Sequence, residues 1–207
     1  MSRLPLEGVR VLDLTRLLPG PFATMILADL GAEVVKVEEP GRGDYTRWNR
    51  IRVGDTSAYF LAINRGKKSV ALDLKKPAAR EALLRLARSA DVLVETFRPG
   101  VMDRLGAGYE AARAANPRLV YCSLTGYGQT GPYRDLPGHD NNYLGYAGLL
   151  SVTGERGGPP RLLGTQVADL GGAQMTAIAI LAALRHRDRT GEGQYLDAAL
   201  MDAGLYW

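Results

Sequence analysis

The stretch that decides the fold is VRVLDLTRLLPGPFATMILADLGAEVVKVE, residues 9–38. Its first part, VRVLDL (9–14), predicts a buried strand, and after a Pro-Gly-Pro break the spacing of FATMILADLG (22–31) predicts a helix closed by Gly31. EVVKVE (33–38) predicts a second buried strand. A strand, a helix and a strand within about thirty residues form a βαβ unit, whose strands are parallel and whose crossover is right-handed.

The same alternation continues to the end of the chain. Residues 40–58, rich in Gly, Arg and Asp, are predicted to form a polar loop. Further strands are predicted at 69–74, 91–96, 118–124 and 194–197, with helices at 75–90, 101–106, 109–116, 141–151 and 168–188. The expected fold class is therefore α/β, a Rossmann-like and mainly parallel sheet with flanking helices, in one domain over 1–207.

Composition and charge exclude several classes of protein. With 46% apolar and 23% charged residues, the chain has the balance of a globular protein with a buried core. The net charge is +4, but Lys and Arg are mixed with carboxylates, which argues against nucleic acid as a partner. The apolar runs are short and no secretory signal is seen, so we expect no membrane association and a cytoplasmic location. A single cysteine, Cys122, permits no internal disulfide.

Most common catalytic motifs are missing from the sequence. There is no phosphate-binding P-loop, no HExxH, no CxxC and no pair of histidines at ligand spacing, so no metal site is predicted. Cys122 lies in an apolar strand pattern and is interpreted as a core residue. His186 lies in the charged helix end RHRDRTGEG and is interpreted as a solvated side chain that favours the helix dipole.

Two positions remain as candidates for chemistry. The first is His139-Asp140, after a Pro-Gly turn, where Gly138 permits close backbone approach and Asp140 is predicted to cap the helix that follows. This pair is either an acid/base group beside an oxyanion-binding helix tip or a plain cap beside a surface histidine.

The second candidate is Asp169, at the start of the long helix in VADLGGAQMTAIAIL. Gly171 and Gly172 follow in its first turn, where each glycine costs about 1 kcal/mol relative to alanine. The glycines leave room either for a ligand or for a second backbone at a helix crossing, and the local pattern does not choose between these.

Several stretches, in order, resemble the family III CoA-transferase superfamily, which includes formyl-CoA transferase, carnitine-CoA transferase and α-methylacyl-CoA racemase. They run from Gly8 to about Leu205: GVRVLDLTRLLPGPFATMILADLGAEVVKVEEPG, NRGKKSVALDL, DVLVETFRPGVMDRLG, NPRLVYCSLTGYGQTGPY and DRTGEGQYLDAALMD. The resemblance implies an acyl-CoA substrate, no cofactor beyond the CoA moiety of that substrate, and a homodimer. It also implies a small second domain, which is absent from these 207 residues, so that the long helix 168–188 would lead toward it.

Within this superfamily, GHDNNYL resembles the racemase branch more than the transferases. That branch carries the histidine of GHDxNYL and an aspartate about thirty residues further on, which correspond to His139 and Asp169. The function predicted on this ground is racemisation of 2-methylacyl-CoA thioesters in fatty acid metabolism, with Asp140 at the oxyanion-binding helix tip. The alternatives are a CoA-transferase in which Asp169 is the nucleophile, and a CoA-binding fragment without turnover.

The resemblance also assigns the CoA contacts. It places Arg104 near the adenine and phosphates, and it places a strand end against the nucleotide. The family often has a basic residue where this chain has Glu39, so Arg42 or Lys36 is expected to substitute. The residues assigned to the CoA pocket are Arg104, Ala71, Leu72, Asp73, Leu74, Phe97, Arg98, Gly138 and Tyr143.

Overall fold

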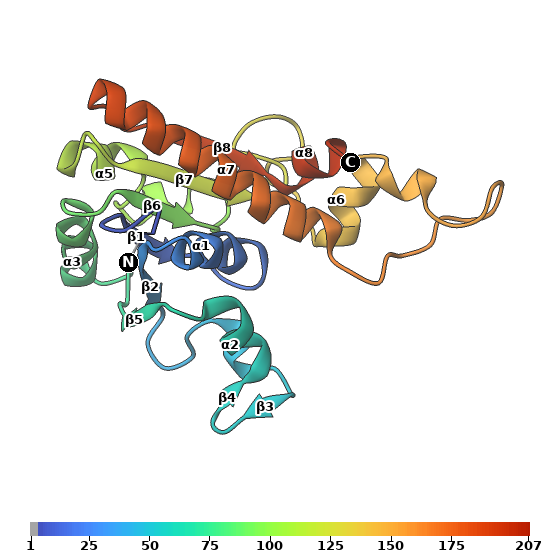
Figure 1. Cartoon of the computed structure of the whole chain (residues 1–207), viewed down its shortest axis with the longest axis horizontal. Coiled ribbons are helices and arrows are strands. Elements are labelled where there is room, and N and C mark those ends of the chain that lie inside the picture. Colours follow the sequence, from blue (N-terminus) through green and yellow to red (C-terminus); the bar gives the residue numbers. More distant parts are fainter. Residues whose placement is uncertain (1–3) are drawn as a thin grey trace.

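Alternating apolar strands and helices produce one sheet with helices on both faces (Figure 1). The computed structural model describes residues 4–207. All pairings in the sheet are parallel, and the spatial order β5-β2-β1-β6-β7-β8 is the 3-2-1-4-5-6 order of a Rossmann sheet. The strands are β1 (Arg10–Leu14), β2 (Glu33–Glu38), β5 (Lys68–Ala71), β6 (Val92–Glu95), β7 (Val120–Thr125) and β8 (Tyr195–Ala199). The predicted fold class is confirmed.

The helices divide between the two faces of the sheet. One face packs its Val and Cys side chains against α1 (Pro19–Asp29) and the long helix α7 (Val167–Thr190). The opposite face packs its Leu and Tyr side chains against three further helices: α3 (Pro77–Ala87), α4 (Val101–Arg104) and α5 (Tyr109–Ala115). In the spatial order of the strands, the direction of the chain's progress reverses between β1 and β6. In sheets of this kind, ligands bind beyond the carboxyl ends of the strands at that point.

Two local predictions were wrong. The Pro-Gly-Pro break lies inside α1, because proline in the first helical turn lacks only an N–H that would be unbonded anyway. The segment 40–58, predicted as a polar loop, contains a 3₁₀ helix and a hairpin, and it forms a lobe with the helix AYFLAIN (58–64), which follows it and is capped by Ser57. The elements of this lobe are the 3₁₀ helix η1 (Tyr45–Trp48), the hairpin β3 (Arg52–Val53) with β4 (Thr56–Ser57), and α2 (Ala58–Asn64).

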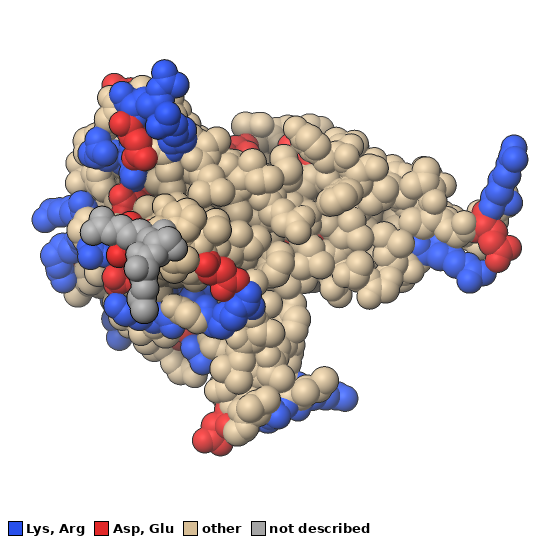
Figure 2. Space-filling view, in the orientation of Figure 1, with Lys and Arg blue, Asp and Glu red and all other residues tan. Residues whose placement is uncertain are grey.

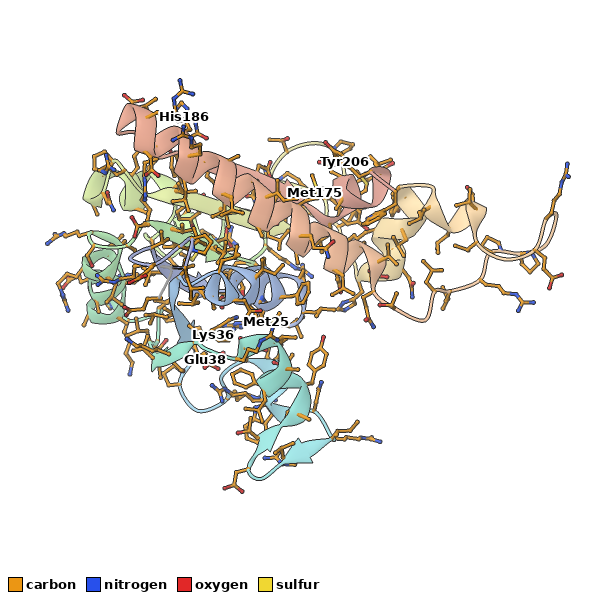
Figure 3. All side chains as sticks on the ribbon, viewed as in Figure 1. Met25, Lys36, Glu38, Met175, His186 and Tyr206 are labelled. Carbon is orange, nitrogen blue, oxygen red and sulfur yellow. The ribbon has the colours of Figure 1, made fainter. Side chains whose placement is uncertain are left out.

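The helix α7 crosses the whole sheet and ends far from α6 (Asp140–Tyr146), with His186 at that far end (Figures 1 and 3). By length and composition it could span a membrane, but half of its most apolar window is buried, as in a core helix. A Cβ at Gly171 would lie 2.7 Å from Trp207 Nε1, and one at Gly172 would collide with Leu200. The two glycines therefore serve a helix crossing, against α8 (Leu200–Leu205).

Beyond α6, the 3₁₀ helix η2 (Leu149–Val152) begins an arm that projects from the body of the molecule (Figure 1). Figure 2 shows the face in this view largely free of charge over the middle of the molecule, with Lys and Arg gathered at its ends. No stripe of positive charge crosses that face, in agreement with the sequence.

A buried charge network ties the start of α1 to the ends of β1 and β2. Lys36 is 1% exposed, and its Nζ donates to the Thr15 carbonyl at 2.8 Å and lies 3.0 Å from Asp44 Oδ2. Lys67 Nζ lies 2.9 Å from Asp13 Oδ2, also inside the protein. Burial alone would raise the pKa of Asp13, but the charges of Lys36 and Lys67 hold that pKa well below its usual range.

Candidate functional site

A cavity of about 270 Å³ opens beyond the carboxyl ends of the strands at the point where their order reverses. Its walls come from the segments that follow β1, β2, β5 and β6, and they combine an aliphatic floor with charged groups at the mouth. The lining residues are Leu14, Arg16, Val37, Glu38, Glu39, Leu72, Asp73, Leu74, Lys75, Phe97, Val101 and Leu105. An apolar slot with charges at its rim suits a flat aromatic base that is joined to phosphates.

The structure brings part of the predicted CoA pocket together at this cavity. Leu72, Asp73, Leu74 and Phe97 line it, while their contact with CoA stays a prediction. Ala71 ends β5 beside Glu38, next to the wall. Two arginines predicted for the CoA pocket lie elsewhere. Arg98 lines a different cavity. Arg104 is exposed on α4, and its guanidinium lies beside Gly100, with Nη1 3.1 Å from the position that a Cβ on Gly100 would occupy.

The positive charge at the cavity comes from residues that the sequence did not single out. Lys36, a proposed substitute for the missing basic residue, is buried in its ion pair with Asp44, and Arg42 is not part of the wall. Arg16 and Lys75 line the mouth, and the Arg16 guanidinium lies 5.2 Å from the centre of the Phe97 ring and 3.8 Å from Glu39. This cation–π contact could not be predicted from the sequence, because Arg16 and Phe97 are about eighty positions apart in the chain.

Asp169 lies in the first turn of α7, half-buried. Neither of its carboxylate oxygens has a hydrogen-bond or ion-pair partner within residues 4–207. Burial raises the pKa of Asp169 to about 7, and the nearby charge of Asp140 adds to the rise. The same carboxylate is close enough to raise the pKa of Tyr59 and of Tyr143 further, although burial is the larger cause for both.

Asp140 does not have the predicted role of cap for its own helix. The helix α6 begins at Asp140, and its N-cap is His139, whose backbone N–H donates to Asn142 Oδ1 at 2.9 Å. The buried carboxylate of Asp140 instead accepts the backbone N–H of Asp169 at 3.0 Å, so it caps the first turn of α7 from outside. The oxyanion-binding tip predicted at the start of α6 stays a prediction.

His139 is exposed, while Asp140 beside it is buried. Among residues 4–207, no hydrogen bond or ion pair joins the His139 ring to Asp169, although the two residues belong to adjoining turns. The two groups are thus brought into one neighbourhood by the contact of α6 with α7, without a direct link.

A tyrosine cluster supports the turn that carries His139. The Tyr143 hydroxyl donates to the Gly138 carbonyl, and its ring packs edge-on against Tyr127 at 5.1 Å between centres. A Cβ on Gly138 would lie 2.6 Å from the Tyr143 ring, and Gly126 is closed in by the same ring. Gly138 and Tyr143, predicted as CoA contacts, therefore shape the turn beside Asp169 and do not line the cavity at the strand ends.

Gly126→Ala is expected to destabilise the protein by about 1–3 kcal/mol, because the new methyl group collides with the ring of Tyr143, a rigid and buried side chain. Gly164→Ala is the matched control, since nothing lies within 4 Å of a Cβ there and the backbone is not left-handed. Urea unfolding of both variants measures the difference. Equal stability of the two variants would show that the tyrosine ring can move aside without cost.

Comparison with known proteins agrees with this architecture. The family model CoA-transferase family III matches residues 6–207. The chain is 48% identical to an acetyl-CoA:oxalate CoA-transferase from Acetobacter aceti, over 97% of this chain and 52% of that protein. It is 46% identical to a succinate–glutarate CoA-transferase from Agrobacterium fabrum, over 96% of this chain and 51% of that protein.

A crystal structure of a CaiB/BaiF family protein from Brucella suis superposes with a TM-score of 0.94 at 43% identity. It covers 99% of this chain and 55% of the other. The chain thus spans about half the length of the curated relatives that it matches. Those relatives bear the names of transferases, so the comparisons support the predicted alternative, CoA transfer, and give no support to the predicted racemase.

Proposed function

Because the chain belongs to CoA-transferase family III, we propose that it supplies the CoA-binding, nucleophile-bearing domain of an enzyme that moves CoA between small carboxylic acids. The observation that carries this proposal is the half-buried carboxylate of Asp169, which has no hydrogen-bond or ion-pair partner in the part of the chain that the structure describes and whose pKa is raised to about 7. A carboxylate with few hydrogen bonds and little water is a better nucleophile than one that is solvated. The relatives named above suggest small dicarboxylic acids as acceptors.

The reaction needs only this carboxylate and the two substrates. Asp169 attacks the carbonyl carbon of the donor acyl-CoA, and the CoA thiolate leaves with the electron pair of the broken C–S bond, which gives an acyl-aspartyl anhydride. The thiolate then attacks the Asp169 carbonyl, the donor acid leaves, and an aspartyl-CoA thioester remains. An acceptor carboxylate repeats the two steps in reverse order and departs as the new acyl-CoA, which regenerates Asp169.

The cavity at the strand ends supports the same proposal. Its aliphatic walls suit the adenine of CoA, and the cations Arg16 and Lys75 at the mouth suit its phosphates. Asp169 lies outside the set of lining residues. The flexible arm of CoA would therefore run from the cavity toward α7, so that binding energy from the nucleotide positions the thioester at the carboxylate.

Trapping the aspartyl intermediate tests the proposal. The chain is incubated with succinyl-CoA and glutarate, then treated with hydroxylamine, and peptides are examined by mass spectrometry for a hydroxamate at Asp169. A hydroxamate that requires acyl-CoA supports transfer. Deuterium incorporation at C2 of a 2-methylacyl-CoA in D₂O without any hydroxamate would instead assign the chain to racemisation, and calorimetric binding of CoA without either reaction would assign it to binding alone.

The first step of transfer is expected to depend on pH through Asp169. The attacking group is the ionised carboxylate, so its rate constant rises about tenfold per pH unit below 7 and becomes level above it. Asp140→Asn removes a charge that raises this pKa, and it should move the rising limb to lower pH. Single-turnover release of CoA from pH 5 to 9 measures both profiles, and a pH-independent rate would contradict the assigned nucleophile.

Assembly and location stay predictions. Large apolar side chains are exposed at Leu205, Tyr206 and Trp207, the last of them to 69%, and Ile178 on α7 is exposed to 57%. Such surface suits coverage by a second copy in the predicted homodimer. Sedimentation velocity of the chain would distinguish monomer from dimer.

A further inference from the structure

A second cavity of about 220 Å³ lies on the face of the sheet that carries α4 and α5. It is separate from the cavity assigned to CoA, because the two share no lining residue. Buried side chains from the ends of β6 and β7 form its floor, and exposed side chains form its rim. The lining residues are Glu95, Arg98, Gly100, Met102, Asp103, Tyr109, Glu110, Tyr121, Ser123, Gln129 and Tyr195.

The floor contains a polar group without a partner. Tyr121 is 1% exposed, yet its hydroxyl makes no hydrogen bond to any described residue. The side-chain nitrogen of Gln129, also buried, is unpartnered as well. Buried polar atoms in folded proteins are nearly always hydrogen-bonded, and those left open in a cavity are the atoms a ligand would use.

The floor also contains a buried acid. Glu95 accepts hydrogen bonds from the Ser123 hydroxyl and from the backbone N–H of Phe97, and Tyr195 donates to Ser123. No cation pairs with Glu95 among the described residues. Burial raises its pKa to about 7, and the charge of Asp103 adds to the rise against the two hydrogen bonds. When it is ionised, Glu95 therefore places a negative charge at the floor of the cavity, and that charge has no ion-pair partner among the described residues.

The side chains at the rim and in the walls favour a positively charged ligand over a negatively charged one. Asp103 and Glu110 at the rim are exposed and form no ion pair among the described residues, whereas Arg98 is the one cation in the wall. The rings of Tyr109, Tyr121 and Tyr195 lie within 5.9 Å of one another, centre to centre, and supply aromatic surface that attracts cations.

We propose that this cavity binds a small aliphatic amine, with one ammonium group between Glu95 and the Tyr121 hydroxyl and its methylene stem along the tyrosine rings. An ammonium group has three donors, and both of these oxygens accept. No three acids or histidines among residues 4–207 lie close enough together to hold a metal ion, which favours an extended cation over a metal. The proposal does not depend on the CoA-transfer activity.

Calorimetry of the 207-residue chain with 1,4-diaminobutane at pH 8 tests the proposal, and 1,4-butanediol serves as a neutral ligand of the same length. Binding of the diamine, at least tenfold tighter than that of the diol, is expected. Equal binding of the two compounds, or no heat up to about 50 mM diamine, would overturn the proposal.

Two variants localise the binding. Tyr121→Phe removes only the unpartnered hydroxyl and is expected to weaken diamine binding at least fivefold, while Tyr133→Phe, an exposed tyrosine outside this cavity, is expected to leave it unchanged. Unfolding curves establish that both variants are folded. The same affinity in both variants would show that the amine binds elsewhere.

Proton release gives an independent readout. The ionisable groups around Glu95 are Arg98 and Asp103 after β6, Tyr109 and Glu110 on α5, Tyr121 and Cys122 on β7, and Tyr195 on β8. A bound ammonium stabilises the ionised form of Glu95, so binding at pH 7 should release up to about half a proton, measured in buffers of different ionisation enthalpy. Glu95→Gln is expected to abolish this release, and an unchanged release in that variant would overturn the assignment.

Discussion

Replacing Asp169 with asparagine is expected to abolish CoA transfer, with a loss of at least about 10³-fold in the single-turnover rate. The amide has nearly the shape of the carboxylate but cannot attack a thioester to form the anhydride. The matched control is Asp202→Asn, because Asp202 occupies the same position in the first turn of α8 but is exposed. Release of CoA after rapid mixing with succinyl-CoA measures both variants. Retention of wild-type rate in Asp169→Asn would remove Asp169 from the mechanism.

The same substitution is expected to stabilise the fold, and the effect depends on pH. The pKa of Asp169 is about 7 in the folded protein and near 3.8 in the unfolded chain, so the folded state binds more protons between these values. Stability of the wild type therefore falls as the pH rises from about 4 to about 7. Asparagine does not titrate, so Asp169→Asn should be about 1–3 kcal/mol more stable at pH 8 and no more stable at pH 4.

Urea unfolding of the wild type and the variant at both pH values checks this result. A gain in stability at pH 8 together with lost transfer would show that the carboxylate is kept at the expense of the fold, as expected of a group used for chemistry. A loss of stability at pH 8 would show instead that the carboxylate serves the helix, as a negative charge in its first turn. The Asp202→Asn control measures that dipole effect in the absence of burial.

The sheet could be predicted from the sequence because strand and helix periodicities are local. VRVLDL and EVVKVE are short, rich in Val and Leu, and separated by a helical pattern, which is typical of the parallel strands of a βαβ unit. The segment 40–58 was mispredicted because its Gly, Arg and Asp content resembles a solvated loop. The structure joins this segment to the end of β2 through the hydrogen-bonded ion pair of Arg47 with Glu38, which the periodicity of the sequence does not show.

The candidate site was predictable only in part for the same reason. Asp169 stood out because a carboxylate opens an apolar helix, and that position is unchanged in the structure. Asp140 was placed correctly near the site but given the wrong helix to cap, since a bond across 29 residues has no sequence signature. The cations at the mouth of the cavity, Arg16 and Lys75, could not be predicted together, because they lie on loops after different strands and meet only when the sheet forms.

The buried lysine of β2 is the second place where a single substitution should have a large effect. Lys36→Met is expected to destabilise the protein by about 3–5 kcal/mol, because it leaves the carboxylate of Asp44 and the carbonyl of Thr15 buried without their partner. Methionine has a similar length and no charge, so packing is largely kept and the loss reports the unpaired acid. The effect should reach the cavity at the strand ends, because Asp44 also accepts the backbone N–H of Leu17, which holds a left-handed conformation at φ 66° beside Arg16.

Lys68→Met on the neighbouring strand provides the matched control. Its ammonium also lies 3.0 Å from a carboxylate, that of Glu33, but both side chains are exposed, and a surface ion pair contributes little to stability. Urea unfolding of the two variants should therefore separate them by several kcal/mol although the two ion pairs have the same length. If Lys36→Met cost no more than Lys68→Met, water would have to reach Asp44 in the folded protein, and the network could not be what holds the Arg16 loop at the mouth of the cavity.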